Sequence, residues 1–175
     1  MPIKTIFLDR DGVINKDVNY AYKIIDFEFN DGIFDVCIYL QNLGYKIIIV
    51  TNQSGIGRGL YSEKDYLKIN QWMLNEFSLK SISILDTFYC PHKPNSSCDC
   101  RKPKPGMFFT AQKKYGIDMN HSWMIGDKET DIESANLAGI NNTVLVRSGH
   151  KIDEMNSNSK FIIDSIEQSQ DIILT

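Results

Sequence analysis

The sequence of 175 residues has few cysteines, no long apolar run and no excess of positive charge. Four cysteines are too few for the disulfide scaffold of a small secreted protein. No apolar run approaches the roughly 20 residues that span a bilayer, so we expect no membrane contact. The formal net charge of −3 gives no basic bias toward nucleic acid. These absences indicate a globular protein but do not identify its activity.

The composition fits one folded domain over residues 1–175. Apolar residues make up 42% of the chain, and this length is sufficient to bury one core. The start of the chain, Met1-Pro2-Ile3-Lys4, leads directly into a strand pattern, which predicts no signal peptide.

Short apolar runs alternate with helical patterns along the chain. The predicted strands are residues 5–8, 46–50, 86–89, 122–125 and 143–146, and the predicted helices are residues 32–43, 62–77, 105–115 and 129–138. Residues 160–175 are expected to form a last strand and a short helix. Strands that are apolar on both faces suit a parallel sheet with helices on each side. The order predicts a doubly wound, Rossmann-like α/β domain that binds ligands beyond the carboxyl ends of its strands.

The first predicted strand ends in two carboxylates, Asp9 and Asp11, followed by Gly12. If the strand geometry continues, both side chains share one face of the sheet. Two close carboxylates repel each other, so they need a cation or a shared proton. The alternative is a polar loop with solvated acids.

Three further segments place polar residues near strand ends. Residues 51–59 begin with Thr51 and Asn52 and continue as a glycine-rich loop, which suits either an anion site or a flexible connection. Residues 101–106 hold three cations at a helix entrance, suited either to phosphoryl charge or to a solvated turn. Asp127 ends a strand and would complete a magnesium site with the first pair. Asp131 is expected to support that site or to open the next helix.

Residues 90–100 contain three thiols and one imidazole. Cys90, His92, Cys98 and Cys100 form a Cys₃His set, which is typical of a closed structural zinc site. Thiolates suit Zn²⁺ and leave Mg²⁺ to the carboxylates. Free thiols, a disulfide or a redox pair are the alternatives. Because this zinc-binding loop runs directly into Arg101 and Lys102, zinc would hold that segment rigid.

The remaining cysteine and histidines have no ligand-like pattern. Cys37 lies on an apolar helical stripe and is predicted to belong to the core. His121 and His150 are predicted to be surface residues.

The order of these motifs resembles the haloacid dehalogenase superfamily of phosphatases. An Asp-x-Asp-Gly, a Thr-Asn, a Lys and a Gly-Asp-x-x-x-Asp follow one another along nearly the whole chain. The resemblance implies a haloacid dehalogenase-type fold with Asp9 as the nucleophile and Asp11 as the general acid and base. It also implies that Thr51 and Lys102 bind the phosphoryl group, and that Asp127 binds Mg²⁺ with Asp9 and the Asp11 main-chain carbonyl.

The spacing of the motifs leaves no room for a separate cap domain in residues 13–50 or 53–101. A capless chain with a Cys-x-His and Cys-x-Cys loop resembles a zinc-containing subgroup of that superfamily. Its members act on D-glycero-D-manno-heptose 1,7-bisphosphate or on histidinol phosphate. Residues 9–15, 26–29 and 51–59 resemble the heptose type, whereas the short spacing across residues 93–97 matches the histidinol type.

The closer resemblance implies Mg²⁺-dependent removal of the heptose 7-phosphate through an aspartyl-phosphate. The expected setting is nucleotide-activated heptose synthesis for surface polysaccharide such as the lipopolysaccharide core, in the cytoplasm, with a monomer as the active form. The alternative is a histidinol-phosphate phosphatase of histidine biosynthesis. Arg101 is the main candidate for a second anion site, with Arg58 and Lys93 as alternatives. The full set of expected substrate contacts is Asp17, Val18, Asn19, Tyr20, Asn52, Gln53, Ser54 and Arg101.

Overall fold

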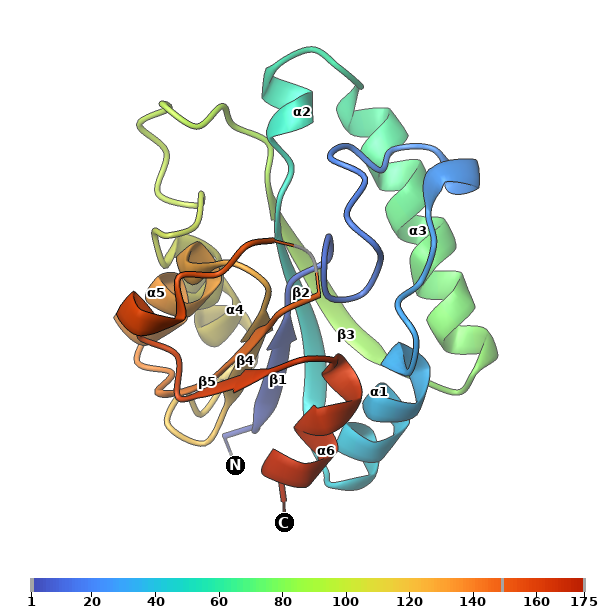
Figure 1. Ribbon diagram of the computed structural model, residues 1–175. Helices are drawn as coiled ribbons and strands as arrows, with labels where there is room; N and C mark the ends of the chain where they lie inside the picture. Colours follow the sequence, from blue (N-terminus) through green and yellow to red (C-terminus); the bar gives the residue numbers. More distant parts are fainter. Residues whose placement is uncertain (1, 149, 175) are drawn as a thin grey trace.

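The computed structural model describes residues 2–148 and 150–174, which contain one six-stranded parallel sheet. The strands are β1 (Thr5–Leu8), β2 (Lys46–Asn52), β3 (Ile84–Cys90), β4 (Trp123–Gly126), β5 (Asn142–Val146) and β6 (Phe161–Ile163). Their order across the sheet is β3-β2-β1-β4-β5-β6 (Figure 1). The predicted doubly wound sheet is therefore confirmed, and its order reverses between β1 and β4, where such sheets bind ligands.

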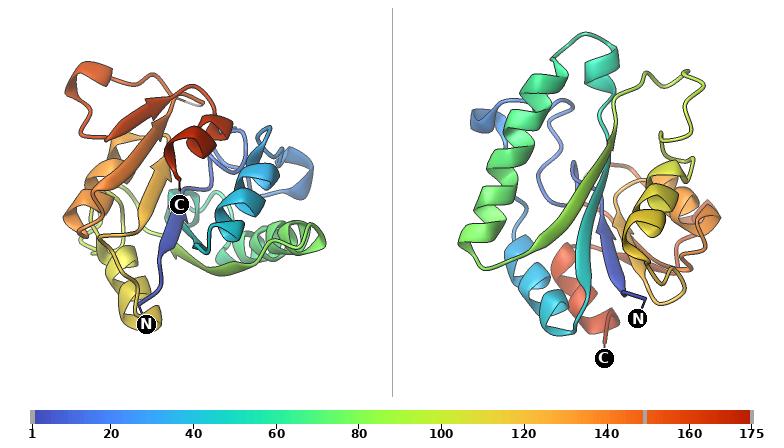
Figure 2. Two further views of the ribbon diagram at one scale, coloured as in Figure 1. Left: turned by 90° about the horizontal axis from the view of Figure 1, so that it is seen from below. Right: turned by 180° about the vertical axis from the view of Figure 1, so that it is seen from behind.

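Helices cover both faces of the sheet, as the views in Figures 1 and 2 show. One face carries α1 (Ile33–Asn42), α3 (Glu63–Leu79) and α6 (Ser169–Ile172), and the other carries α4 (Gly106–Tyr115) and α5 (Glu129–Leu137). Alternate residues of β1 divide between the two cores, because Ile6 and Leu8 pack on one side and Phe7 on the other. This double burial explains why the central strands are apolar throughout.

The predicted helix boundaries are close to the observed ones. The predicted start of the helix at residues 62–77 is confirmed by a capping box at the start of α3. The Asp65 backbone N–H donates to Ser62 Oγ at 3.1 Å, and the Ser62 N–H donates to Asp65 Oδ2 at 2.9 Å. Short 3₁₀ turns complete the fold at Ile24–Asp26, Glu154–Asn156 and Ile166–Gln168.

The glycine-rich segment after β2 is not the flexible connection that the sequence left open. It contains a one-turn helix, α2 (Ser54–Gly57). A Cβ on Gly55 would lie 2.1 Å from the Tyr61 ring, and a Cβ on Gly57 would lie 2.7 Å from the Pro91 carbonyl oxygen. These glycines therefore permit close packing of α2 against Tyr61 and the zinc-binding loop.

Besides loops, the described chain between β1 and β3 contains only one 3₁₀ turn, α1, β2, α2 and α3. The predicted capless arrangement is confirmed. No helix within residues 2–148 and 150–174 is long and apolar enough to cross a membrane.

Candidate active site

A polar cleft of about 350 Å³ opens beyond the carboxyl ends of β1 and β2. Most residues predicted for the site line it: Asp9, Asp11, Asp17, Asn19, Tyr20, Thr51, Asn52, Gln53, Ser54, Arg101 and Lys102. Val18 does not line the cleft, and its side chain is 48% exposed. Asp127 is fully buried beside the cleft. The structure thus gathers segments from five parts of the chain, as predicted for the carboxyl end of a doubly wound sheet.

The Lys102 ammonium is buried between two carboxylates. Its Nζ lies 2.8 Å from Asp9 Oδ1 and 2.6 Å from Asp131 Oδ1, and it donates to the Val50 carbonyl oxygen at 2.8 Å. Although burial alone would lower it, the Asp131 and Asp9 carboxylates raise the pKa of Lys102. A permanent cation therefore lies beside Asp9, where it would neutralise a phosphoryl group.

Asn52 fixes the backbone of Lys102. Its Nδ2 donates to the Lys102 carbonyl oxygen at 3.1 Å, and its Oδ1 accepts from the Lys102 N–H at 3.1 Å. The amide thus joins the end of β2 to the segment that follows the zinc-binding loop. This is a positioning contact, and the predicted contact of Asn52 with substrate stays a prediction.

Asp9, Asp127 and Asp131 bring carboxylate oxygens within 4.8 Å of one another. Burial and the Asp131 charge raise the pKa of Asp9 to about 6, and burial and the Asp9 charge raise the pKa of Asp127 to about 9. In the described chain, Asp127 Oδ1 is buried without any hydrogen-bond donor. An unpartnered buried carboxylate oxygen beside a second carboxylate suits a hard divalent cation such as Mg²⁺.

Unlike Asp127 Oδ1, the carboxylate oxygens of Asp131 already have partners in the protein. Besides its ion pair with Lys102, it accepts the backbone N–H groups of Asp127 at 3.2 Å and Lys128 at 3.1 Å. A Cβ on Gly126 would lie only 2.3 Å from the Asp131 Cβ, so this approach requires glycine. Asp131 therefore opens α5 and pairs with Lys102, and its support of a magnesium site stays a prediction. Asp9 and Asp127 remain the pair that fits the metal.

The chain turns sharply directly after β1. The strand ends at Leu8, so the alternation that would put Asp9 and Asp11 on one face does not extend to Asp11. Gly12 has a φ of 95°, and a Cβ there would lie 2.2 Å from Asp127 Oδ2. Asp11 therefore reaches the cleft because the chain turns here, and not because it shares a strand face with Asp9 as predicted.

The Asp11 carboxylate is held by three side chains. It accepts from Arg10 Nη2 at 2.9 Å, Asn15 Nδ2 at 3.0 Å and Gln53 Nε2 at 3.0 Å. Although burial alone would raise it, the Arg10 guanidinium lowers the pKa of Asp11. The carboxylate keeps one edge toward the cleft, since its side chain is 17% exposed.

Gln53 links Asp11 to the end of β2. Its Nε2 also donates to Thr51 Oγ1 at 2.9 Å, and its Oε1 accepts from the Tyr61 hydroxyl at 2.6 Å. Tyr61 was missed in the sequence because it lies between α2 and α3 without a motif of its own. The side-chain network thus fixes Thr51, predicted to bind the phosphoryl group, and Asp11 together.

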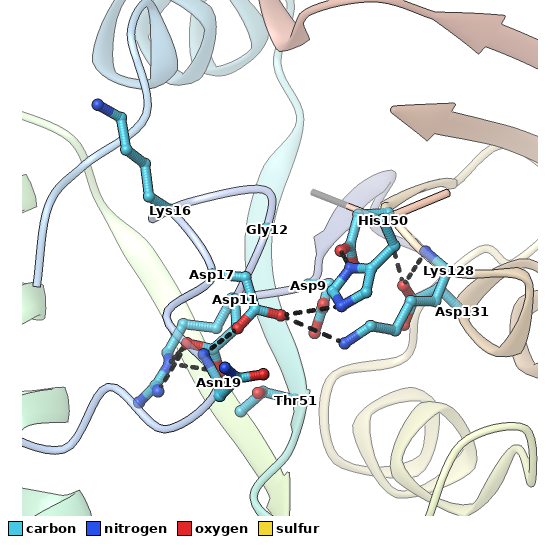
Figure 3. Close-up of polar contacts among 12 residues, drawn as sticks. Asp9, Asp11, Gly12, Lys16, Asp17, Asn19, Thr51, Lys128, Asp131 and His150 are labelled. Atoms are coloured by element: carbon cyan, nitrogen blue, oxygen red, sulfur yellow. Dashed lines mark hydrogen bonds and ion pairs between the residues drawn. The ribbon is translucent and has the colours of Figure 1, made fainter. Parts of the chain in front are cut away.

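Asp17, Lys128 and His150 meet at the rim of the cleft (Figure 3). Asp17 Oδ2 lies 3.3 Å from His150 Nε2 and 3.5 Å from Lys128 Nζ. His150 Nδ1 lies 2.7 Å from Asp127 Oδ2. The prediction that His150 is a surface residue is confirmed, since its side chain is 40% exposed. The prediction that it has no ligand-like neighbours is wrong, because it lies beside Asp17 and Asp127 at the cleft.

The four predicted zinc ligands converge. The Cys90 Sγ lies 3.4 Å from His92 Nδ1 and 3.8 Å from Cys98 Sγ, and His92 Nδ1 lies 3.3 Å from Cys100 Sγ. All four ligand atoms lie within 4.8 Å of one another. Tetrahedral zinc with bonds of about 2.0 to 2.3 Å would hold such atoms roughly 3.5 to 3.8 Å apart. The cluster therefore fits zinc, and Cys37 is buried in the core as predicted.

Comparison with known proteins identifies the family. A family model described as "HAD-hyrolase-like" matches residues 99–169. A D-glycero-alpha-D-manno-heptose-1,7-bisphosphate 7-phosphatase of Photorhabdus laumondii is 48% identical over 164 residues, which cover 90% of each chain. This chain belongs to the D-glycero-D-manno-heptose-1,7-bisphosphate 7-phosphatase family. A beta-named enzyme of this family from the same organism is 43% identical, over 94% of this chain and 92% of the relative.

A solved structure of the heptose bisphosphate phosphatase family supports the same assignment. The D,D-heptose 1,7-bisphosphate phosphatase of B. bronchiseptica matches with a TM-score of 0.86 and 26% identity over 97% of each chain. That protein was crystallised in complex with magnesium and phosphate. The resemblance inferred from the motif order is therefore confirmed.

We predict that Cys98→Ser lowers the zinc content, because it removes one of four converging ligands. Turnover should fall with it, since the zinc-binding loop leads directly to Lys102. Metal analysis after dialysis against a weak chelator checks the first effect. Cys37→Ala is the matched control and should keep one zinc per chain, whereas full zinc retention by Cys98→Ser would refute the ligand assignment.

We predict that Asp127→Asn stabilises the magnesium-free protein, and more so at pH 8 than at pH 5. With a folded pKa of about 9, Asp127 keeps its proton over a range where the unfolded chain, with a pKa of about 3.9, has released it. The wild type therefore loses stability as pH rises from about 4 to 9, and asparagine removes that loss. Thermal unfolding at both pH values measures the difference, and a pH-independent difference would contradict the prediction.

Proposed function

We propose that this chain is a Mg²⁺-dependent phosphatase that removes the 7-phosphate of D-glycero-D-manno-heptose 1,7-bisphosphate. The observation that carries the proposal is the position of Asp9 between the Lys102 ammonium and Asp127, in a chain 48% identical to an enzyme of that name. A mere phosphate-binding protein needs no carboxylate nucleophile at that position. The single sheet with short loops leaves the cleft open to a small sugar phosphate.

In the first half-reaction, an Asp9 carboxylate oxygen attacks the phosphorus of the 7-phosphate. The bond between phosphorus and the C7 oxygen breaks, and that oxygen takes a proton from Asp11. Because Arg10 lowers the pKa of Asp11 in the free protein, Asp11 must gain this proton before the step. Lys102 and Thr51 bind the phosphoryl oxygens during the transfer. Mg²⁺ held by Asp9, Asp127 and the Asp11 main-chain carbonyl would neutralise phosphoryl charge.

In the second half-reaction, Asp11 takes a proton from a water molecule, whose oxygen attacks the phosphorus of the aspartyl-phosphate. The bond between Asp9 and phosphorus breaks, and inorganic phosphate leaves. Asp11 acts as acid first and base second, which returns the site to its starting protonation state.

The rim of the cleft supplies groups for the sugar and its other phosphate. Arg101, Lys128 and His150 line it and offer positive charge or hydrogen-bond donors. We propose that Arg101 and Lys128 bind the 1-phosphate. The sugar hydroxyls would contact the other predicted residues that line the cleft, namely Asp17, Asn19, Tyr20, Gln53 and Ser54.

We assign the α anomer as the preferred substrate, since the alpha-named relative from P. laumondii is 48% identical and the beta-named one 43%. Such a product feeds nucleotide-activated heptose synthesis for surface polysaccharide, including a lipopolysaccharide core. We propose that the enzyme acts in the cytoplasm as a monomer, with structural zinc and catalytic magnesium.

The test is phosphate release with Mg²⁺ from both heptose bisphosphate anomers, histidinol phosphate and fructose 1,6-bisphosphate, compared by kcat/KM. We expect the highest value for the α anomer. Higher turnover of histidinol phosphate would overturn the substrate assignment and favour the alternative suggested by the spacing across residues 93–97.

The matched variant is Asp9→Asn, which replaces the nucleophile by an isosteric amide. We expect a loss of about 10³-fold or more in turnover. The variant should still fold and keep its zinc, because Asp131 still pairs with Lys102. Near-wild-type turnover by this variant would contradict the mechanism even if the substrate assignment holds.

A further inference from the structure

Arg10 is a fully buried cation next to the catalytic pair, with 1% of its surface exposed. Its guanidinium lies over the rings of Phe27 and Tyr66, at 5.8 and 5.7 Å from their centroids. Its Nη2 donates to the Ala21 carbonyl oxygen at 2.8 Å. These contacts come from the connection between β1 and α1 and from α3, and they hold the planar group in one orientation.

The fixed guanidinium faces Asp11. Nε lies 3.2 Å from both carboxylate oxygens, and Nη2 lies 2.9 Å from Oδ1. Within residues 2–148 and 150–174, Asp11 is the only carboxylate paired with Arg10, while Arg10 Nη1 is buried without an acceptor. Arg10 thus directs two nitrogens to Asp11 while its buried Nη1 has no acceptor. A buried donor without an acceptor lowers the stability of the fold, so stability alone does not explain this arrangement.

The other contacts of Asp11 complete a directional restraint. Asn15 Nδ2 donates to Oδ1 and Gln53 Nε2 donates to Oδ2, each at 3.0 Å. The carboxylate is therefore held from three sides, and its 17% exposure is toward the cleft that it lines. Arg10 is the only charged member of this restraint in the described chain.

We propose that Arg10 is a positioning residue that holds the Asp11 carboxylate at the edge of the cleft for proton transfer to the leaving sugar oxygen. The inference rests on the proposed function, in which Asp11 is the acid and base. Proton transfer requires that donor and acceptor lie within hydrogen-bond distance, so a displaced Asp11 would transfer the proton poorly. A lysine keeps the charge but lacks the planar two-nitrogen geometry.

The test compares Arg10→Lys with the wild type on two leaving groups. For a sugar phosphate, whose alkoxide must be protonated, we expect kcat to fall about 10²-fold with KM changed less than about threefold. For 4-nitrophenyl phosphate, nitrophenolate leaves without a proton, so the burst of nitrophenolate should keep its wild-type rate within about threefold. Arg147→Lys is the matched control, because Arg147 pairs with the exposed Glu154 and Asp164, and it should leave both substrates unchanged.

A double-mutant cycle separates positioning from general damage. In an Asp11→Asn background, Arg10→Lys should cause no further loss of sugar-phosphate turnover, because its effect passes through the Asp11 carboxylate. Equal losses on both leaving groups, or an additional loss in the Asp11→Asn background, would overturn the proposal.

A milder variant keeps the test decisive if Arg10→Lys does not fold. Phe27→Leu removes one ring beside the guanidinium and should lower sugar-phosphate kcat severalfold while sparing the nitrophenolate burst. Equal effects on both substrates would overturn the proposal. Any alkyl phosphate that the wild type hydrolyses can replace the sugar phosphate in these kcat comparisons. If the wild type did not hydrolyse the heptose bisphosphate, that result would refute the proposed substrate and not the role of Arg10.

Discussion

The structure depends on the buried Lys102 ammonium between Asp9 and Asp131. Its contacts of 2.8 and 2.6 Å join three segments that are far apart in sequence: the end of β1, the segment after the zinc-binding loop and the first turn of α5. A buried cation is tolerated only when carboxylates neutralise it, and buried carboxylates likewise require a cation. Each segment must therefore be in place for the others to be stable, and together they produce the charge that phosphoryl transfer needs.

The surrounding elements hold this cluster in position. Asn52 binds both backbone groups of Lys102, and Gly106 lets the start of α4 pack against the zinc-binding loop, where a Cβ would lie 2.3 Å from the Asp99 carbonyl oxygen. Gly57 makes a similar approach from α2. The four converging zinc ligands therefore belong to a loop packed between two helices, and the cation that it presents does not depend on a flexible chain.

Much of this arrangement could be predicted from the sequence. The β-branched apolar runs and the glycines after helices define a parallel sheet, and polar residues at strand ends define one edge of it as the site. Tertiary contacts could not be predicted in this way. The return of His150 over Asp127, the pairing of Lys102 with Asp131 and the burial of Arg10 depend on how distant segments meet, which no local pattern encodes. The expectation that residues 17–20 all contact substrate took no account of side-chain direction. The Val18 side chain does not line the cleft.

The central claim is that Asp9, held beside Lys102, is the nucleophile that receives the phosphoryl group. The most direct measurement is rapid quenching in acid during turnover, followed by peptide mass spectrometry of the trapped acyl phosphate. The account predicts a phosphoryl group on the peptide that contains Asp9, on the Asp9 side chain, and none in Asp9→Asn. A phosphoryl group on another residue, or steady turnover by Asp9→Asn with no trapped intermediate, would contradict it.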